Sequence, residues 1–170
     1  SPPDLRQLPV GERIQSPLLV LEIEHRDSGT GGFTTLILGN ASGRLPSAPF
    51  WAEAQPRIHG ITRGDVAWVV GEIGQYNGKR QIKVASLRVL PRGEVDWRRL
   101  MPSVPDVRPC WDAIDRWRAG IRQPRLAASV NLFYDDPDFR RRYQECPASV
   151  QGHHARLGGL LEHTCEVASI

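Results

Sequence analysis

The stretch from Val66 to Val89, VAWVVGEIGQYNGKRQIKVASLRV, consists of two apolar runs joined by an Asn-Gly pair. The first run, residues 66–73, is rich in valine, and the second, residues 81–89, alternates between apolar and polar side chains. Alternation with a period of two predicts a strand with one buried face. The Asn77-Gly78 pair is the strongest short signal for a hairpin turn. The stretch therefore predicts two antiparallel strands.

Three further strands are predicted upstream. Residues 18–24 and 33–38 are apolar or alternating and are separated by a glycine-rich turn, and residues 44–51 form a third segment that Pro46 and Pro49 restrict to an interrupted or edge strand. The connection over residues 52–64 is long enough for a helix. Five short strands with a longer connection between the third and the fourth follow the order of an OB-fold barrel.

Three short motifs resemble those of nucleic-acid-binding OB-folds. They are a Leu-Gly-Asn-Ala-Ser-Gly turn at 38–43, Gly-Asp-Val at 64–66, and Gly-Glu-Ile followed by Tyr-Asn-Gly-Lys-Arg-Gln-Ile at 71–73 and 76–82. Asn40 departs from the usual Asp, a change of little weight because both residues cap turns. The motifs predict an OB-fold over residues 18–92.

An OB-fold binds single strands with a basic groove and aromatic platforms on which bases stack. We expect Trp51 and Tyr76 to stack, although aromatic residues at strand ends also close the ends of barrels. The expected phosphate contacts are Arg44, Lys79, Arg80 and Lys83. Residues 79–99 include seven basic and two acidic residues. Such a cluster is typical of a surface that binds a polyanion, and equally of an ordinary solvent-exposed face. Trp68, in a valine-rich run, is expected in the core.

Composition restricts the class of protein. The net charge is +3, with 40% hydrophobic and 24% charged residues, which is ordinary for a soluble globular chain. The sequence has neither an apolar run that could span a bilayer nor a secretory signal, so we expect a cytoplasmic protein without a membrane partner. Its three cysteines form no Cys-x-x-Cys pair, which argues against a zinc ribbon.

The second half of the chain has a helical pattern. Apolar residues recur at helical spacing after Pro109, and further helices are expected after Pro124 and Pro137. The predicted organisation is an extension over 1–17, the barrel over 18–92, a linker over 93–108 and helices over 109–170. About 60 residues form a core only marginally by themselves. We therefore expect this part to pack on the barrel, on further helices or on a second copy, as a homo-oligomer.

The segment richest in candidate catalytic and metal-binding side chains lies at residues 153–164 and reads His-His-Ala-Arg-Leu-Gly-Gly-Leu-Leu-Glu-His-Thr. Gly158 and Gly159 permit a tight backbone before a helix whose apolar face begins at Leu160. His163 is expected among the core-facing positions of that helix. An imidazole there is either a satisfied core histidine or a metal ligand.

The whole segment, preceded by Pro147-Ala148, resembles the start of an HD-superfamily phosphohydrolase domain, in particular that of the YhaM-type 3'-to-5' exoribonucleases, which carry an OB-fold ahead of it. The resemblance implies an α+β fold, a barrel followed by the first helices of an HD domain. It also implies that His163 is the first ligand of a divalent metal (Mn, Fe or Mg), and that His153 and His154 are catalytic and hold metal or phosphate.

The remaining ligands of the family are a His-Asp dipeptide and a later Asp, and this chain contains no His-Asp dipeptide. We therefore expect an incomplete HD domain that holds no metal stably and is inactive by itself. The complete protein is expected to be an exoribonuclease acting on single-stranded RNA or DNA. Two alternatives remain: a non-catalytic nucleic-acid-binding module, and an HD phosphohydrolase acting on nucleotides.

Overall fold

The computed structural model describes residues 2–29, 31–149 and 154–169. The chain forms two compact units, which divide between Met101 and Pro102. This boundary lies inside the segment that the sequence suggests as a linker. The two units are described separately below.

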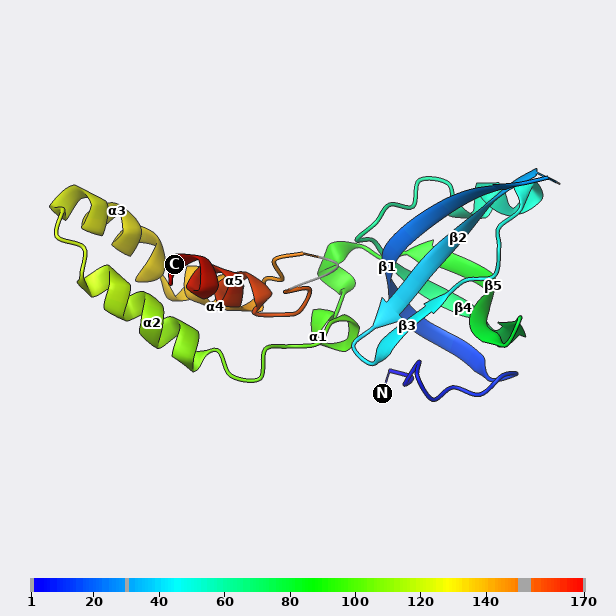
Figure 1. The fold of residues 1–170 in the computed structure, drawn as a ribbon, viewed down its shortest axis with the longest axis horizontal. Coiled ribbons are helices and arrows are strands. Elements are labelled where there is room, and N and C mark those ends of the chain that lie inside the picture. Colours follow the sequence, from blue (N-terminus) through cyan, green and yellow to red (C-terminus); the bar gives the residue numbers. More distant parts are fainter. Residues whose placement is uncertain (1, 30, 150–153, 170) are drawn as a thin grey trace. The chain divides into compact units, whose positions relative to one another are not determined.

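The first unit is a five-stranded barrel (Figure 1). Its strands are β1 (Arg13–Ser28), β2 (Gly31–Asn40), β3 (Gly43–Pro46), β4 (Val66–Tyr76) and β5 (Lys79–Val89). Hydrogen-bonded neighbours follow the order β3-β2-β1-β4-β5, all antiparallel. A parallel bridge between Ser47 and Ile82 joins the two edges. A closed sheet with this order is the predicted OB-fold.

Three short helical segments complete this unit. They are the 3-10 helices η1 (Ala52–Ile58) and η2 (Arg92–Glu94) and one helical turn, α1 (Trp97–Leu100). The η1 helix lies in the connection between β3 and β4, where the sequence allows a helix. The β4–β5 turn has positive φ angles of 48° at Asn77 and 75° at Gly78, as the Asn-Gly pair predicts.

The N-terminal residues belong to the barrel rather than to an extension. Strand β1 begins at Arg13, upstream of the predicted start at Leu18. Leu5 is only 1% exposed and packs in the barrel core with Leu8 at its edge. The side-chain amide of Asn40 donates to the carbonyl of Pro3 at 2.8 Å. A segment without strand periodicity is thus held by one anchoring leucine and by hydrogen bonds to the barrel.

The position of Trp68 differs from the prediction that this residue lies in the core. Its neighbours Ala67 and Val69 are fully buried, so Trp68 points to the opposite face of β4 and is half-buried outside the core. The alternation of inward and outward side chains is not visible in the valine-rich run, because Val66, next to the buried Ala67, is buried as well. A side chain's place on a strand therefore follows from the register and not from the composition of the run.

The second unit contains four helices: α2 (Arg108–Ala119), α3 (Pro124–Tyr134), α4 (Pro137–Glu145) and α5 (Gly159–Ala168). Prolines occupy the first turns of α2, α3 and α4, where a missing N–H costs nothing. The Asp136 side chain caps α4 by accepting from the Asp138 N–H. The predicted helical pattern is confirmed in each case.

The core of this unit contains Trp111 and Ile114 from α2 and Leu161 from α5. Leu161 and Cys165, four residues apart, are on the inward face of α5, whereas His163 is exposed. The prediction that His163 faces the core is therefore wrong. The apolar face of α5 is also only partly exposed, since Leu161 is buried while Val167 is 56% exposed.

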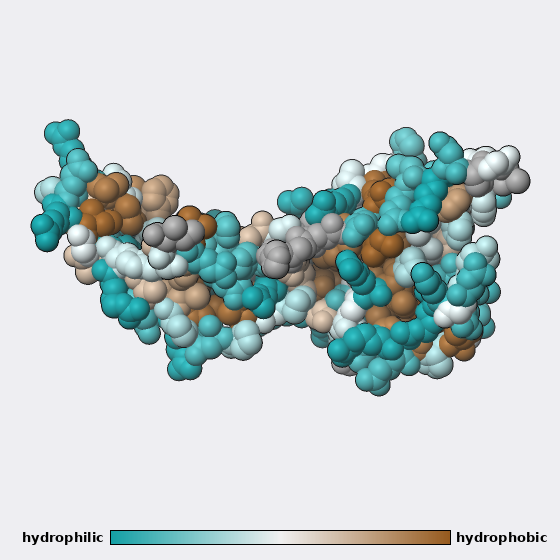
Figure 2. Space-filling view, in the orientation of Figure 1, coloured by the Kyte–Doolittle hydropathy of each residue, from teal (hydrophilic) through white to brown (hydrophobic). Residues whose placement is uncertain are grey.

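None of the helices described is long and apolar enough to cross a membrane. Apolar side chains do reach the surface over α3, as Figure 2 shows. Leu126, Leu132 and Phe133 are 49%, 74% and 55% exposed. Exposed apolar side chains on one helix suit an interface, and self-association through this part of the chain stays a prediction.

Candidate nucleic-acid interface and histidine cluster

Trp51, one of the two predicted stacking residues, pairs with Phe33. Their ring centroids are 4.8 Å apart and their planes are tilted by 51°. Trp51 directly precedes η1, and Phe33 lies near the start of β2. Trp51 is 38% exposed, so part of the indole is open to a base. Phe33 and Trp51 are 18 positions apart in the sequence, and the pairing of residue 50 with residue 34 brings them together.

A polar network around the buried Thr34 connects the beginning of η1, directly after Trp51, to strands β1 and β2. The amide of Gln55 on η1 donates to the Phe50 carbonyl at 2.7 Å and contacts the Thr34 hydroxyl at 3.0 Å. Thr34, only 1% exposed, is also 2.8 Å from Nδ1 of His25. The network lines a cavity of about 730 Å³ between η1 and the β1–β2 hairpin. The network thus ties η1 to β2, the strand that carries Phe33.

Tyr76 and Lys79 face each other across the β4–β5 turn. Tyr76 is 67% exposed and Lys79 is also exposed. Both side chains are thus open to solvent at the β4–β5 loop, which OB-folds use for oligonucleotides; stacking by Tyr76 and phosphate contact by Lys79 stay predictions.

Two predicted phosphate contacts are already engaged. Arg80 donates from Nη1 to the Leu8 carbonyl at 2.7 Å and from Nη2 to the Arg6 carbonyl at 2.8 Å. It therefore holds the N-terminal segment on the barrel with two of its five N–H donors. Arg44 lies 3.8 Å from the Glu22 carboxylate, which partly neutralises its charge.

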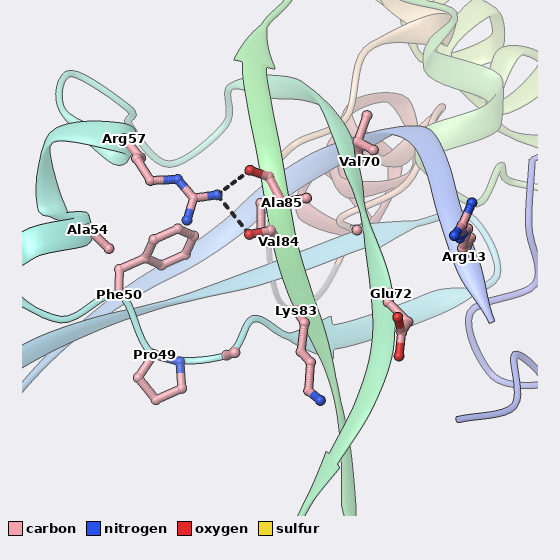
Figure 3. A pocket seen from close by; sticks show the side chains of 12 residues that line it. Arg13, Pro49, Phe50, Ala54, Arg57, Val70, Glu72, Lys83, Val84 and Ala85 are labelled. Atoms are coloured by element: carbon pink, nitrogen blue, oxygen red, sulfur yellow. Dashed lines mark hydrogen bonds between the residues drawn. The ribbon is translucent and has the colours of Figure 1, made fainter. Parts of the chain in front are cut away.

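Lys83 lines a groove of about 560 Å³ between β4, β5 and the segment leading into η1 (Figure 3). Arg13 from β1 and Arg57 from η1 line the same groove. No sequence pattern points to either arginine. Arg13 lies in the predicted N-terminal extension, and Arg57 lies in a connection whose path no local pattern predicts.

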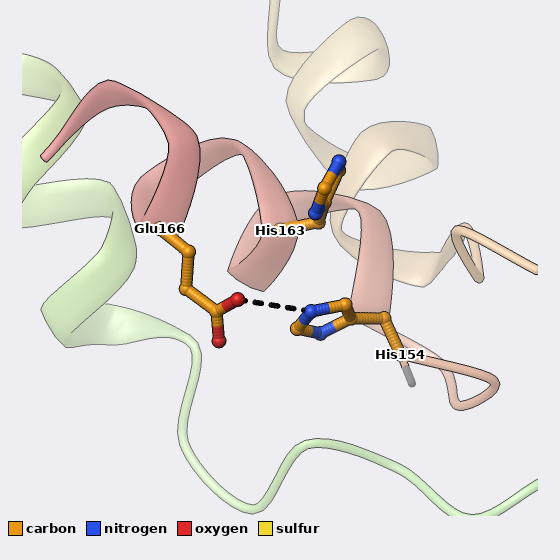
Figure 4. Close-up of side chains that lie close together, drawn as sticks. All are labelled: His154, His163 and Glu166. Carbon is orange, nitrogen blue, oxygen red and sulfur yellow. Dashed lines mark ion pairs between the residues drawn. The ribbon is translucent and has the colours of Figure 1, made fainter. Parts of the chain in front are cut away.

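The histidine-rich segment forms a compact cluster in the second unit (Figure 4). Gly158 adopts a left-handed conformation, with φ of 84°, directly before α5. A Cβ atom on Gly159 would overlap the carbonyl group of His154. The Gly-Gly pair therefore lets the chain fold back so that His154 lies beside α5. His153 lies outside the described residues.

His154 is held between two carboxylates. Its Nδ1 lies 2.8 Å from Glu162 and its Nε2 lies 3.0 Å from Glu166. Arg156 also donates to Glu162, from Nε at 3.0 Å and from Nη2. Hydrogen bonds from Arg156, and then from His154, hold the pKa of the Glu162 carboxyl below its ordinary value. Glu162 is thus a charged anchor that orients the imidazole.

One ligand atom from each of His154, His163 and Glu166 lies within 4.8 Å of the others. The distance of 3.0 Å between Nε2 of His154 and the Glu166 carboxylate is that of an ion pair between the two side chains. Imidazole and carboxylate donors suit Mn, Fe or Zn. A carboxylate on the other ring nitrogen, here Glu162, is the usual outer support of a histidine ligand. The three side chains therefore offer donor types that divalent cations use, with His163 and Glu166 exposed to solvent.

No family model matches the chain. A protein of Oceanobacillus iheyensis named 3'-5' exoribonuclease YhaM is 26% identical over 168 residues, 95% of this chain and 51% of that protein. Proteins with the same name from Shouchella clausii and Geobacillus are each 24% identical, over 98% and 95% of this chain. The chain spans about half the length of these curated relatives.

Among solved structures, the second OB-fold domain of replication protein A from Methanococcus maripaludis aligns with a TM-score of 0.36 and 17% identity, over 51% of this chain and 89% of that domain. The OB-fold assignment rests on the strand order given above. The relatives' similarity spans both units of the chain. Over nearly its whole length, the chain is similar to the YhaM 3'-5' exoribonucleases, which confirms the resemblance predicted from its motifs.

Proposed function

We propose that the barrel binds single-stranded RNA and that the helical unit contributes the first part of a metal-dependent 3'-to-5' exoribonuclease site. The observation that carries this proposal is the similarity to YhaM exoribonucleases over 95% of the chain, which includes the barrel and the histidine cluster together. A barrel that holds a single strand would present its 3' end for hydrolysis.

Base stacking on the Phe33–Trp51 pair supports the binding part of this proposal. We expect Trp51→Ala to weaken the binding of a labelled oligouridylate, measured by fluorescence anisotropy, by about 1–3 kcal/mol, the usual value of one stacked base. Trp117→Ala is a matched control, because Trp117 is 39% exposed against 38% for Trp51 but lies in the helical unit. Equal affinities of the two variants would exclude Trp51 as a stacking residue.

The histidine cluster supports the catalytic part. We propose that His163, His154 and Glu166 hold a divalent cation and that Glu162 keeps His154 oriented. A bound cation of this kind lowers the pKa of a water ligand and stabilises charge on a phosphodiester. Arg156, which is paired with Glu162, also places a positive charge next to this position, where a phosphate oxygen would be bound.

Metal binding can be measured without activity. We expect isothermal titration with Mn²⁺ to show weak binding that His163→Ala abolishes, while His59→Ala, an exposed histidine of the barrel, leaves it unchanged. Weak binding is expected because the sequence lacks the His-Asp dipeptide of the family. Rapid, Mn²⁺-dependent hydrolysis of RNA by this chain would contradict the expectation that it is inactive by itself.

The two alternative functions differ in what they bind. A protein acting on free nucleotides predicts no affinity for oligonucleotides, whereas a single-strand-binding barrel predicts an affinity that falls steeply with salt. A non-catalytic module predicts the same RNA binding but no Mn²⁺ site at His163.

A further inference from the structure

The groove beside β5 concentrates positive charge on one surface of the barrel. Arg13, Glu72 and Lys83 are neighbours in register across β1, β4 and β5, so they project from the same face of the sheet. Arg57 reaches the groove from η1 (Figure 3). The lining therefore carries three cations and one carboxylate.

Arg57 is held in place by the strand it faces. Its Nη2 donates to the carbonyls of Val84 and Ala85 at 2.7 and 2.6 Å, and its guanidinium lies 5.6 Å from the centroid of the Phe50 ring. Guanidinium has five N–H donors. In the described parts of the chain, nothing else accepts from Nε or Nη1 of Arg57. These donors are preorganised and available.

The stem of Lys83 lies against β4. A Cβ atom on Gly74 would lie 2.6 Å from Cε and 3.0 Å from Cγ of Lys83. The aliphatic stem of the lysine thus occupies the space that a side chain at position 74 would fill.

The charges of the groove are less neutralised than those of the β2–β3 face. On that face, Arg44 is next to Glu22, and Glu24 lines the same shallow pocket. Within the described ranges, neither Arg13 nor Arg57 nor Lys83 has a carboxylate within 4.0 Å. A polyanion therefore finds more uncompensated charge in the groove beside β5.

We propose that this groove binds the phosphate backbone of the single strand, with Arg57 and Lys83 as phosphate contacts and Arg13 at its edge. The inference rests on the proposed RNA binding by the barrel and assigns the path of the strand to the β4–β5 side. Trp51 directly follows Phe50, whose ring lines the groove, so a base stacked on Trp51 would have its phosphates near Arg57.

Salt dependence tests this assignment. Each lost phosphate contact reduces the slope of log K against log salt by about 0.7 for a single strand. We expect Arg57→Gln/Lys83→Gln to reduce the slope for a labelled oligouridylate by about 1.4, with an affinity loss of about two- to fivefold for each cation. Arg63→Gln/Arg92→Gln is the matched control, since it removes the same charge at exposed positions outside the groove.

Arg57 also supports the backbone of β5, so circular dichroism must show that the double variant is folded. Lys83→Gln alone removes no structural hydrogen bond among the described residues and is expected to lower the slope by about 0.7. The groove assignment would be overturned if the Lys83→Gln chain and the double variant were folded and kept the wild-type slope. It would also be overturned if the control double variant lost as much slope as the groove variant. In both cases the proposed RNA binding by the barrel would stand. Failure of the unaltered chain to bind RNA would instead contradict the proposed function and, with it, this inference.

Discussion

At the scale of single residues, the arginines of the barrel differ in what their guanidinium groups already hold. Both terminal nitrogens of Arg80 are used by carbonyls of the N-terminal segment, and Arg44 is next to a glutamate. Arg57 likewise gives two N–H donors to carbonyls, both from Nη2. A count of basic residues therefore overestimates the positive charge that a ligand meets where a carboxylate is close, as at Arg44.

Gly71 is a residue whose replacement tests the packing of β4 on β5. It lies at the irregularity in β4–β5 pairing, and a Cβ atom there would overlap the Lys83 carbonyl. We expect Gly71→Ala to lower the free energy of unfolding by about 1–3 kcal/mol, the usual cost of overpacking, in urea unfolding followed by circular dichroism. Gly93→Ala is the control, because no atom lies within 4 Å of its Cβ position. Similar stability of both variants would show that the strands can separate locally without cost.

At the scale of elements, Asp115 connects the helices of the second unit. From α2 it accepts from Arg118 at 2.9 Å and from Arg140 of α4 at 3.0 Å. Arg140 in turn stacks 4.1 Å from the centroid of the Trp111 ring, and Arg118 also donates to the Tyr134 carbonyl of α3 at 3.2 Å. The Asp115 carboxylate thus binds two arginines, and together these contacts connect α2, α3 and α4.

This connection makes the helical unit sensitive to acid. Hydrogen bonding by Arg140 holds the pKa of Asp115 below its ordinary value of 3.8. A lowered pKa contributes stability that is present above pH 3.8 and is lost as the pH falls through the folded-state pKa. Because the side chain is 43% exposed, we expect about 0.5–1 kcal/mol.

Asp115→Asn removes this contribution. At neutral pH, the variant is expected to have a lower midpoint of thermal unfolding than the unaltered chain. Below pH 3.8, the variant is expected to lose less stability than the unaltered chain. Asp112→Asn, an exposed acid on the same helix, serves as the control. Parallel pH profiles for the Asp115 variant and the unaltered chain would rule out this role.

At the scale of the whole molecule, the barrel has a core of its own. All five strands and the residues of the barrel core lie before Met101. The proposed stacking pair and the groove also lie in this unit. The barrel therefore contains everything that the proposed RNA binding requires.

We expect a chain shortened to residues 1–101 to fold and to bind oligouridylate within about twofold of the longer chain, since exposed charges outside a site contribute little. Circular dichroism and fluorescence anisotropy measure the two properties. A folded barrel with strongly reduced affinity would show that the helical unit supplies part of the binding surface.

Much of the fold could be predicted from the sequence. Period-two alternation and the Asn-Gly pair predicted β4, β5 and their turn, and prolines at first turns marked α2 to α4. The start of β1 and the burial of Leu5 were missed. Both depend on contacts with residues far along the chain, which no local pattern records.

For the candidate sites, the residue types could be read from the sequence alone: aromatic residues at strand ends, basic residues around β5, and the histidine-rich segment with its glycine pair. The partners of these residues were set by the folding of the chain. It engaged Arg80 with the N-terminal segment, brought Arg57 to the groove, and turned His163 outward beside His154 and Glu166. The reason is physical: local periodicity follows from the backbone, whereas the partners of a side chain follow from hydrogen bonds and packing between segments that meet only in the folded chain.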